Sequence, residues 1–218
     1  MEKEIFEKAF VDSLNKNFPR RSKYYDFKFL VFHELRGLVF EINNCLTLEF
    51  HRATITLTNN LLERLLKLTL IYSEAGIGPK PVEDWGTIFE EPNRKYSSIP
   101  LGNSIEKCRK LDLITEQEKI FLFDKIRELM RNGFSHADSS KILEGVPTET
   151  TMYQASFANP TEIKQVTVKQ TVVPFIQAVH IENFAKANAE YYFDFVLELM
   201  GRIENRLTDK NKTDNGTE

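Results

Sequence analysis

The stretch that most constrains the fold is the most apolar part of the chain, residues 57–71. Five polar residues interrupt it: Asn59, Asn60, Glu63, Arg64 and Lys67. These interruptions exclude a membrane span, which needs roughly 20 consecutive apolar residues. Apolar residues recur here at three- and four-residue steps, which predicts a helix from about His51 to Ser73 that ends before Gly76 and Gly78. The apolar content of this helix implies deep burial.

The same periodicity predicts helices along most of the chain. The predicted ranges are Ile5–Leu14, Phe27–Leu46, Ser104–Leu111, Thr115–Arg131 and Ile181–Arg206. We expect a break over residues 18–25 and a long loop over residues 76–100, where four of the eight prolines and three of the nine glycines lie. Thr115 and Glu118 have the spacing of a capping box, and Gly133 is expected to end the helix that starts there.

A stretch rich in Thr, Val and aromatic residues follows. Residues 151–157 and 163–173 alternate in places and are separated by Asn159 and Pro160, which predicts a β-hairpin. The fold class is therefore mainly α, a helical bundle with a small inserted β-hairpin. We divide the chain into an N-terminal helix and loop (1–26), a helical domain (27–207) with the insertion near 151–173, and a disordered tail (208–218).

Charge and cysteine content exclude several classes of protein. The 29 Lys and Arg residues against 32 Asp and Glu give a net charge of −3, which argues against a collective basic surface. Cys45 and Cys108 lie far apart and fit neither a disulfide framework nor a zinc site. No metal or cofactor site is expected, and the N-terminus lacks a signal-peptide pattern, so we expect a cytoplasmic protein.

The sharpest local motif is Arg131-Asn132-Gly133-Phe134-Ser135-His136. At 100° per residue, Phe123, Ile126 and Met130 face the core, and Arg131 lies roughly 80° from Phe123, at the edge of that face. A positive φ at Gly133 would close the helix and fold His136 back towards Arg131.

This pair suits cleavage of a phosphodiester. A histidine near neutral pKa can take the proton of a ribose 2′-hydroxyl or protonate the leaving oxygen, and an arginine can hold the phosphate. The alternative is structural, because both side chains would also neutralise the helix C-terminus, where a cation is stabilised by about 0.3–1 kcal/mol.

The motif resembles the Arg-x(4–6)-His signature of the HEPN superfamily (higher eukaryotes and prokaryotes nucleotide-binding), in which Asn often follows the Arg. Its context is similar to that family as well. Leu61-Leu62-Glu63-Arg64-Leu65-Leu66-Lys67 resembles the Glu-bearing helix of the family. Residues 105–131 resemble its next helical pair, and residues 181–206 its closing helix.

The resemblance implies an all-α bundle that forms a homodimer in which two motifs share a cleft. Many members are metal-independent endoribonucleases of toxin–antitoxin, abortive-infection or CRISPR-associated systems, and others only bind. By this resemblance His136 would be the general acid or base, Arg131 the phosphate clamp and Asn132 an orienting residue. Glu63 would hold the arginine, or it would form an i,i+4 pair with Lys67 worth about 0.2–0.5 kcal/mol.

Two features depart from the family pattern. Members controlled by a nucleotidyltransferase often carry a tyrosine two residues after the histidine, where this chain has Asp138. Asp138 either raises the pKa of His136 by a hydrogen bond or caps the following turn. The hairpin is not part of the minimal bundle, and it could act as a dimer arm, a lid or a substrate-selecting element.

A second, weaker candidate is the basic and aromatic segment at Arg20, Arg21 and Lys23, beside Tyr24 and Tyr25. Charge next to stacking surfaces is typical of single-stranded RNA binders, but such residues in a loop are usually solvated surface.

These observations favour a homodimeric, metal-independent endoribonuclease that cleaves RNA by 2′-hydroxyl attack, in a prokaryotic toxin–antitoxin or phage-defence setting with a possible antitoxin or defence partner. The rivals are a catalytically silent HEPN-like module that binds RNA, a nucleotide or a protein, and a structural helical adaptor. The acidic net charge favours the rivals.

Overall fold

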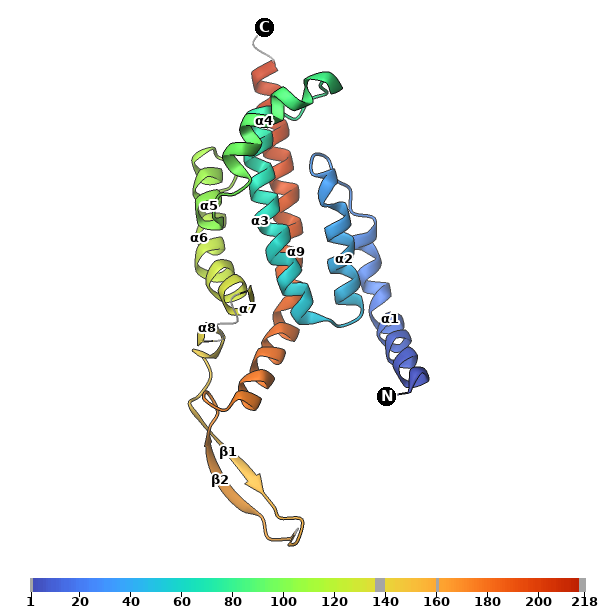
Figure 1. Ribbon diagram of the computed structural model, residues 1–218, viewed down its shortest axis with the longest axis vertical. Coiled ribbons are helices and arrows are strands. Elements are labelled where there is room, and N and C mark those ends of the chain that lie inside the picture. Colours follow the sequence, from blue (N-terminus) through green and yellow to red (C-terminus); the bar gives the residue numbers. More distant parts are fainter. Residues whose placement is uncertain (1, 136–139, 160, 216–218) are drawn as a thin grey trace.

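A computed structural model describes residues 2–135, 140–159 and 161–215 of the chain. The chain is mainly α-helical with a small two-stranded antiparallel sheet, as the sequence predicted. Two long helices, α3 (His51–Ala75) and α9 (Pro174–Asn215), run side by side in the same direction through the centre of the molecule (Figure 1). Among the described residues no helix is long and apolar enough to cross a membrane.

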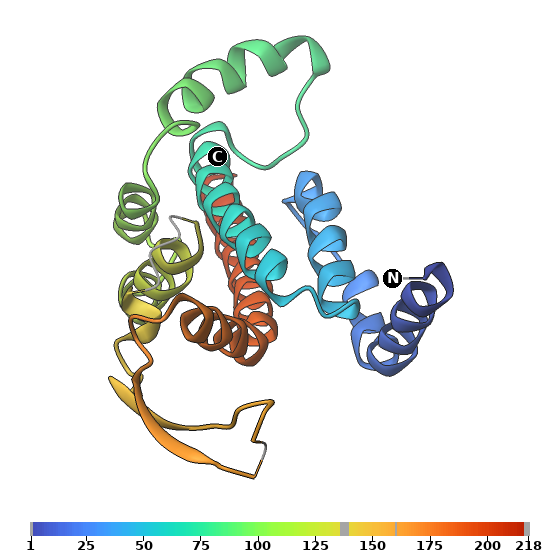
Figure 2. The same ribbon diagram turned by 60° about the horizontal axis from the view of Figure 1, so that its bottom comes forward.

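The remaining helices flank this central pair. Helices α1 (Lys3–Tyr25) and α2 (Arg36–Thr47) lie on one side, and α5 (Leu101–Lys110) and α6 (Glu116–Phe121) lie on the other (Figures 1 and 2). The core is built by fully buried side chains that recur at three and four residues along both central helices: Leu62, Leu65, Leu66, Phe193, Val196, Met200 and Ile203. The predicted deep burial of the residue 51–73 helix is confirmed.

A buried carboxylate joins the end of α9 to the segment before α2. Glu204 is 1% exposed, and its Oε1 accepts backbone N–H bonds from Leu30, Val31 and Phe32 at 3.1, 2.8 and 3.0 Å. N–H groups turned towards this carboxylate do not lie in a helical ladder. The predicted helix over residues 27–46 is therefore wrong in its first part: only a short 3₁₀ turn, η1 (His33–Leu35), precedes α2.

A second carboxylate, Glu118, fastens α6 to α9. The predicted capping box is confirmed, because Thr115 Oγ1 accepts from the Glu118 N–H at 3.1 Å and Glu118 Oε2 accepts from the Thr115 N–H at 2.7 Å. The same carboxylate pairs with Arg202 at 2.7 Å and Arg206 at 2.8 Å. Burial raises the pKa of Glu118, but the hydrogen bonds from Arg206, the Thr115 N–H and Arg202 outweigh it and hold the pKa below its ordinary value.

The predicted break over residues 18–25 is also wrong, because α1 continues through Pro19 to Tyr25. Proline removes a helical N–H and normally disrupts the helix. Here the turns around it bury Asn17, Arg21 and Tyr24 against the bundle, and this packing offsets the loss.

The expected loop over residues 76–100 contains a helix. A 3₁₀ turn, η2 (Val82–Asp84), leads into α4 (Trp85–Tyr96), which packs on α3. Proline at 81, just before the first turn, suits a helix start, and α4 buries Pro92 and Tyr96. The expected disordered tail is helical as far as Asn215, where α9 ends, since Leu207 is buried and Lys210 Nζ hydrogen-bonds the Leu111 carbonyl.

The sheet is a hairpin of β1 (Glu149–Gln154) and β2 (Lys164–Lys169), which confirms the predicted insertion. It projects from the end of the bundle at which α9 begins (Figure 1). Two short helices, α7 (Gly133–Ser135) and α8 (Ser140–Leu143), precede it at the same end.

Candidate functional site

The segment that leads to the Arg-His motif is a π-helix, η3 (Leu122–Asn132). Its i→i+5 hydrogen bonds widen each turn, so the 100° geometry used for Arg131 does not apply. The core-facing positions are Leu122, Ile126 and Met130, each four residues apart and buried, while Phe123 is half-buried. π-Helical turns are rare and occur frequently at functional sites.

Gly133 does not close the helix. Its φ of −65° and ψ of −33° are right-handed helical values, and α7 continues directly from η3. The expected positive φ at Gly133 is therefore wrong, and the chain does not reverse at this residue; the expected position of His136 lies outside the described residues. The buried Gly133 continues the helix where the chain passes against the core.

The structure describes the motif only in part. Arg131 and Asn132 are the last residues of η3, and their side chains lie outside the described set. His136 and Asp138 lie outside the described residues altogether. The catalytic roles of all four residues stay predictions.

The carbonyl immediately before Arg131 is held by a buried amide. Asn59 of α3, 4% exposed, donates from Nδ2 to the Met130 carbonyl oxygen at 3.0 Å. The hydroxyl of Tyr192 of α9 donates to Asn59 Oδ1 at 2.8 Å. A chain of two hydrogen bonds thus ties α9, α3 and the end of η3 together beside the motif.

Glu63 lies one turn of α3 beyond Asn59 and is half-buried. Burial raises the pKa of the Tyr192 hydroxyl well above its ordinary value, and the charge of Glu63 raises it further. The phenol therefore stays protonated as a donor to Asn59, and the carboxylate of Glu63 is within electrostatic reach of this cluster. Whether Glu63 holds Arg131 or pairs with Lys67 stays a prediction.

An aromatic pair fixes the chain just after the motif begins. Phe134 of α7 stacks on Phe184 of α9, with ring centroids 5.9 Å apart and an interplanar angle of 30°. Asn59 binds the carbonyl of Met130 and Phe184 stacks on Phe134, so the backbone from 130 to 134 is held against both central helices.

Two of the basic residues of α1 form ion pairs with α9. The Arg21 side chain is buried and pairs with Glu190 of α9 at 2.6 Å, and the same carboxylate pairs with Arg20 at 3.1 Å. Lys23 is exposed and lies over the Tyr24 ring, 4.7 Å from its centroid. These residues belong to a helix instead of the expected loop, and Arg21 fastens α1 to α9.

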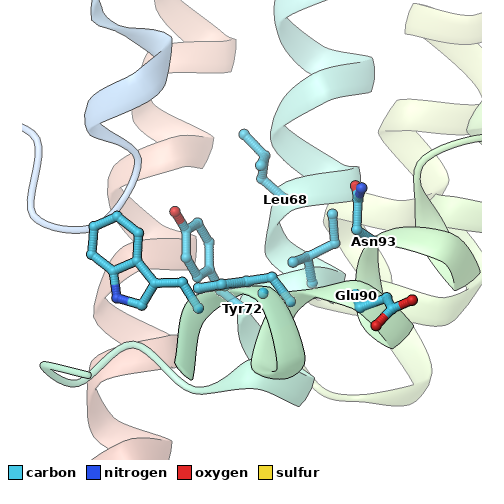
Figure 3. A pocket seen from close by; sticks show the side chains of 8 residues that line it. Leu68, Tyr72, Glu90 and Asn93 are labelled. Carbon is cyan, nitrogen blue, oxygen red and sulfur yellow. The ribbon is translucent and has the colours of Figure 1, made fainter. Parts of the chain in front are cut away.

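A pocket of about 370 Å³ lies at the far end of α3, between α3 and α4 (Figure 3). Its lining includes Leu68, Tyr72, Trp85 and Phe89, with Glu90 and Asn93 as polar members. A mainly apolar lining with one carboxylate does not suit a phosphate backbone. Asn59 and Tyr72 are 13 residues apart, about 20 Å along a helix, so the pocket is separate from the motif.

Neither cysteine is an evident nucleophile. Cys108 is buried, and burial raises the pKa of its thiol to about 12, while burial and then Glu41 raise the pKa of Cys45. No group of three or more His, Cys, Asp or Glu side chains gathers as a metal site in the part of the chain that the structure describes.

Comparisons of the chain with protein-family models, with curated proteins and with solved structures gave no match.

Sequence reasoning missed Asn59, Tyr192 and the π-helix. Asn59 could have been found, because it occupies the same helical face as Ile55, Leu62 and Leu66 and is the polar member of that face. A buried amide needs hydrogen-bond partners, so its position predicts a polar contact inside the core.

Proposed function

We propose that the chain is a HEPN-like, metal-independent endoribonuclease that acts as a homodimer in a prokaryotic toxin–antitoxin or phage-defence setting. The observation that carries the proposal is the bond from Asn59 to the Met130 carbonyl at the end of a π-helix. It fixes the backbone at Arg131 next to the Glu-bearing turn of α3. A reactive group needs this kind of support, since a loosely held one loses its alignment.

In this proposal the 2′-hydroxyl of the ribose attacks the adjacent phosphate. His136 takes the hydroxyl proton or donates one to the leaving 5′-oxygen, and Arg131 stabilises the negative charge of the transition state. Asn132 orients the site, Glu63 positions Arg131, and Asp138 favours the protonated form of His136. The products are a 2′,3′-cyclic phosphate and a 5′-hydroxyl, and neither a metal nor a cofactor takes part.

A catalytically silent module that binds RNA, a nucleotide or a protein is the second candidate. The net charge of −3 favours it, because nucleic-acid enzymes usually have a basic surface. An antitoxin or defence protein is the partner that we would expect in either case.

The test is cleavage of a mixed set of single-stranded and hairpin RNAs by the purified protein in EDTA. We expect cyclic-phosphate products, an intact DNA strand of the same sequence, and a loss of about 10²-fold or more in His136→Ala and in Arg131→Ala. His33→Ala is the matched control, because His33 is exposed and remote from the motif.

Three results would overturn the mechanism: cleavage of DNA, loss of activity on chelation, or full activity in the double Ala variant. If the wild-type protein cleaves no RNA but retains it in a binding assay, the silent module is correct.

A further inference from the structure

The β1–β2 hairpin is an arm that is attached to the bundle at Gln170 and whose two strands are largely exposed. At the base, Gln170 is buried. Its Oε1 accepts a hydrogen bond from His180 Nε2 of α9 at 3.0 Å, and its Nε2 donates one to the Pro147 carbonyl. Beyond this anchor every residue of β1 is exposed except the half-buried Thr150. A lone two-stranded hairpin is marginally stable in water, so this arm lacks the packing that a stable sheet needs.

One face of the hairpin carries apolar side chains at its middle, with Gln154 and Lys164 at the outer end of the same face. Met152 lies opposite Val166, and Thr150 lies opposite Val168, so these four side chains share a face. Met152 is 43% and Val166 37% exposed. The opposite face carries Glu149 and Lys169, which lie across from each other. An exposed apolar face on an arm is typical of an interaction surface.

The two outer edges of the arm differ. Within the described part of the chain the sheet contains β1 and β2 alone, so each strand has one edge without a neighbour. β2 carries a lysine at each end, Lys164 and Lys169, a pattern by which proteins protect an edge from pairing. β1 has no lysine and no proline, and its sequence is Glu-Thr-Thr-Met-Tyr-Gln.

We propose that the free edge of β1 pairs with β1 of a second copy of this chain, which gives a four-stranded antiparallel sheet in the order β2-β1-β1-β2. This inference rests on the homodimer of the proposed function and identifies its contact.

Symmetry and charge both favour a second copy as the occupant. Antiparallel pairing of identical strands requires a two-fold axis perpendicular to the sheet, and this axis places the Met152 and Val166 faces of both copies on the same side. The single charge of β1, Glu149, lies at one end of the strand, so the antiparallel arrangement keeps the two carboxylates at opposite ends. Backbone hydrogen bonds supply affinity, and the joined apolar face supplies burial.

The pairing would place the two helical bundles at opposite ends of the joined sheet, because each β1 begins at its own bundle and the paired strands run antiparallel. The chain passes from η3 through α7 and α8 directly into β1, and all of these elements lie at the same end of the bundle (Figure 1). Each Arg131 segment therefore lies near its own arm, and the joined sheet lies between the two motifs.

The test uses a matched pair of threonines. Thr151 and Thr167 lie directly opposite each other on one face of the hairpin, Thr151 on the free edge strand β1 and Thr167 on β2. Thr151 is near the middle of β1, so it approaches its own counterpart across the axis. We expect Thr151→Lys to weaken dimerisation about tenfold or more in sedimentation equilibrium, because it opposes like charges. Thr167→Lys should leave the dimer unchanged.

Two measurements separate lost pairing from a misfolded arm. An equimolar mixture of Thr151→Lys and Thr151→Glu should restore the dimer, since opposite charges then meet across the axis. Hydrogen exchange of the β1 amides should slow as wild-type concentration rises.

The inference is overturned if the wild-type protein is monomeric at every concentration, if both lysine variants weaken the dimer equally, or if the mixture stays dissociated. Its failure is distinct from failure of the proposed function: an active dimer insensitive to Thr151→Lys refutes only the arm, and a charge-sensitive dimer that cleaves no RNA refutes only the enzyme.

Discussion

The α3–α9 core and the β1–β2 arm differ in how far their polar groups are paired and their apolar groups are buried. In the core, Glu118 and Glu204 meet donors from other elements, and the leucines of α3 are fully buried. In the arm, Met152 and Tyr153 are 43% and 74% exposed, and among the described residues one edge of β1 has no neighbouring strand. The core is complete within one chain, whereas the arm is not.

This difference indicates where stability and association reside. Buried carboxylates with several donors contribute to folding, because loss of one leaves unsatisfied groups inside the protein. Exposed apolar side chains on an unpaired strand contribute little to folding of the single chain, and their burial requires another molecule. Substitutions in the two regions should therefore affect different measurements.

The largest loss of folding stability is expected when Glu204 is replaced. Replacing it with Ala leaves the N–H groups of Leu30, Val31 and Phe32 without their acceptor, and each unsatisfied buried group costs about 1–3 kcal/mol. We expect Glu204→Ala to lower the free energy of unfolding by about 3 kcal/mol or more, since the Phe32 N–H is fully buried. Urea denaturation followed by circular dichroism measures this change.

Two other variants sharpen this test. Glu204→Gln keeps an amide oxygen as acceptor and should cost less than Ala. Glu198→Ala on the same helix should change stability by less than about 1 kcal/mol, because the Glu198 side chain is 72% exposed. Equal effects of Glu204→Ala and Glu198→Ala would contradict the anchoring role.

Sequence reasoning found the elements whose cause is local. The α3 periodicity, the Thr115–Glu118 capping box and the hairpin around Asn159 each depend on neighbouring residues, and all three are present. It failed where a distant contact decides the conformation. Residues 27–32 leave the helical pattern where Glu204, more than 170 positions away, binds the N–H groups of Leu30, Val31 and Phe32. α1 passes through Pro19 because α9 offers Glu190 to Arg21.

The candidate site shows the same division. The position of Glu63 on α3 could be predicted. The π-helix could not, because the four-residue spacing of the buried Leu122, Ile126 and Met130 fits an α-helix as well. Gly133 was misread for the same reason: a glycine permits a positive φ but does not require one.

A smaller loss of folding stability is expected when Glu118 is replaced, and the size of this loss should depend on pH. Its pKa is lowered in the folded state, against about 4.3 when unfolded, so its contribution is present above that unfolded value and is lost as pH falls through the lower folded value. Glu118→Gln should therefore destabilise the protein by about 1.5–3 kcal/mol at neutral pH, the range for hydrogen bonds to a charged group.

The difference between the wild-type protein and Glu118→Gln should shrink as the pH falls below about 4.3. Glu116→Gln is the matched control on the same helix, because the Glu116 side chain is 54% exposed and its pair with Arg109 is screened by solvent. A gap between wild type and Glu118→Gln that is constant from neutral to acid pH would show that the carboxylate acts by packing alone.

The smallest effect on folding is expected from removal of the arm. Replacing residues 149–169 with a short Gly/Ser linker keeps Gln170 and its bond to His180, and it removes side chains that are almost all exposed. We expect helical content to be retained and the free energy of unfolding, measured where the wild type is monomeric, to change by about 0.5 kcal/mol or less, as for exposed substitutions. Dimerisation should be lost in the same variant. If the deletion unfolds the bundle, the arm belongs to the core and the distinction between the two regions is wrong. If the deletion leaves both the fold and the dimer intact, the dimer interface lies on the helices.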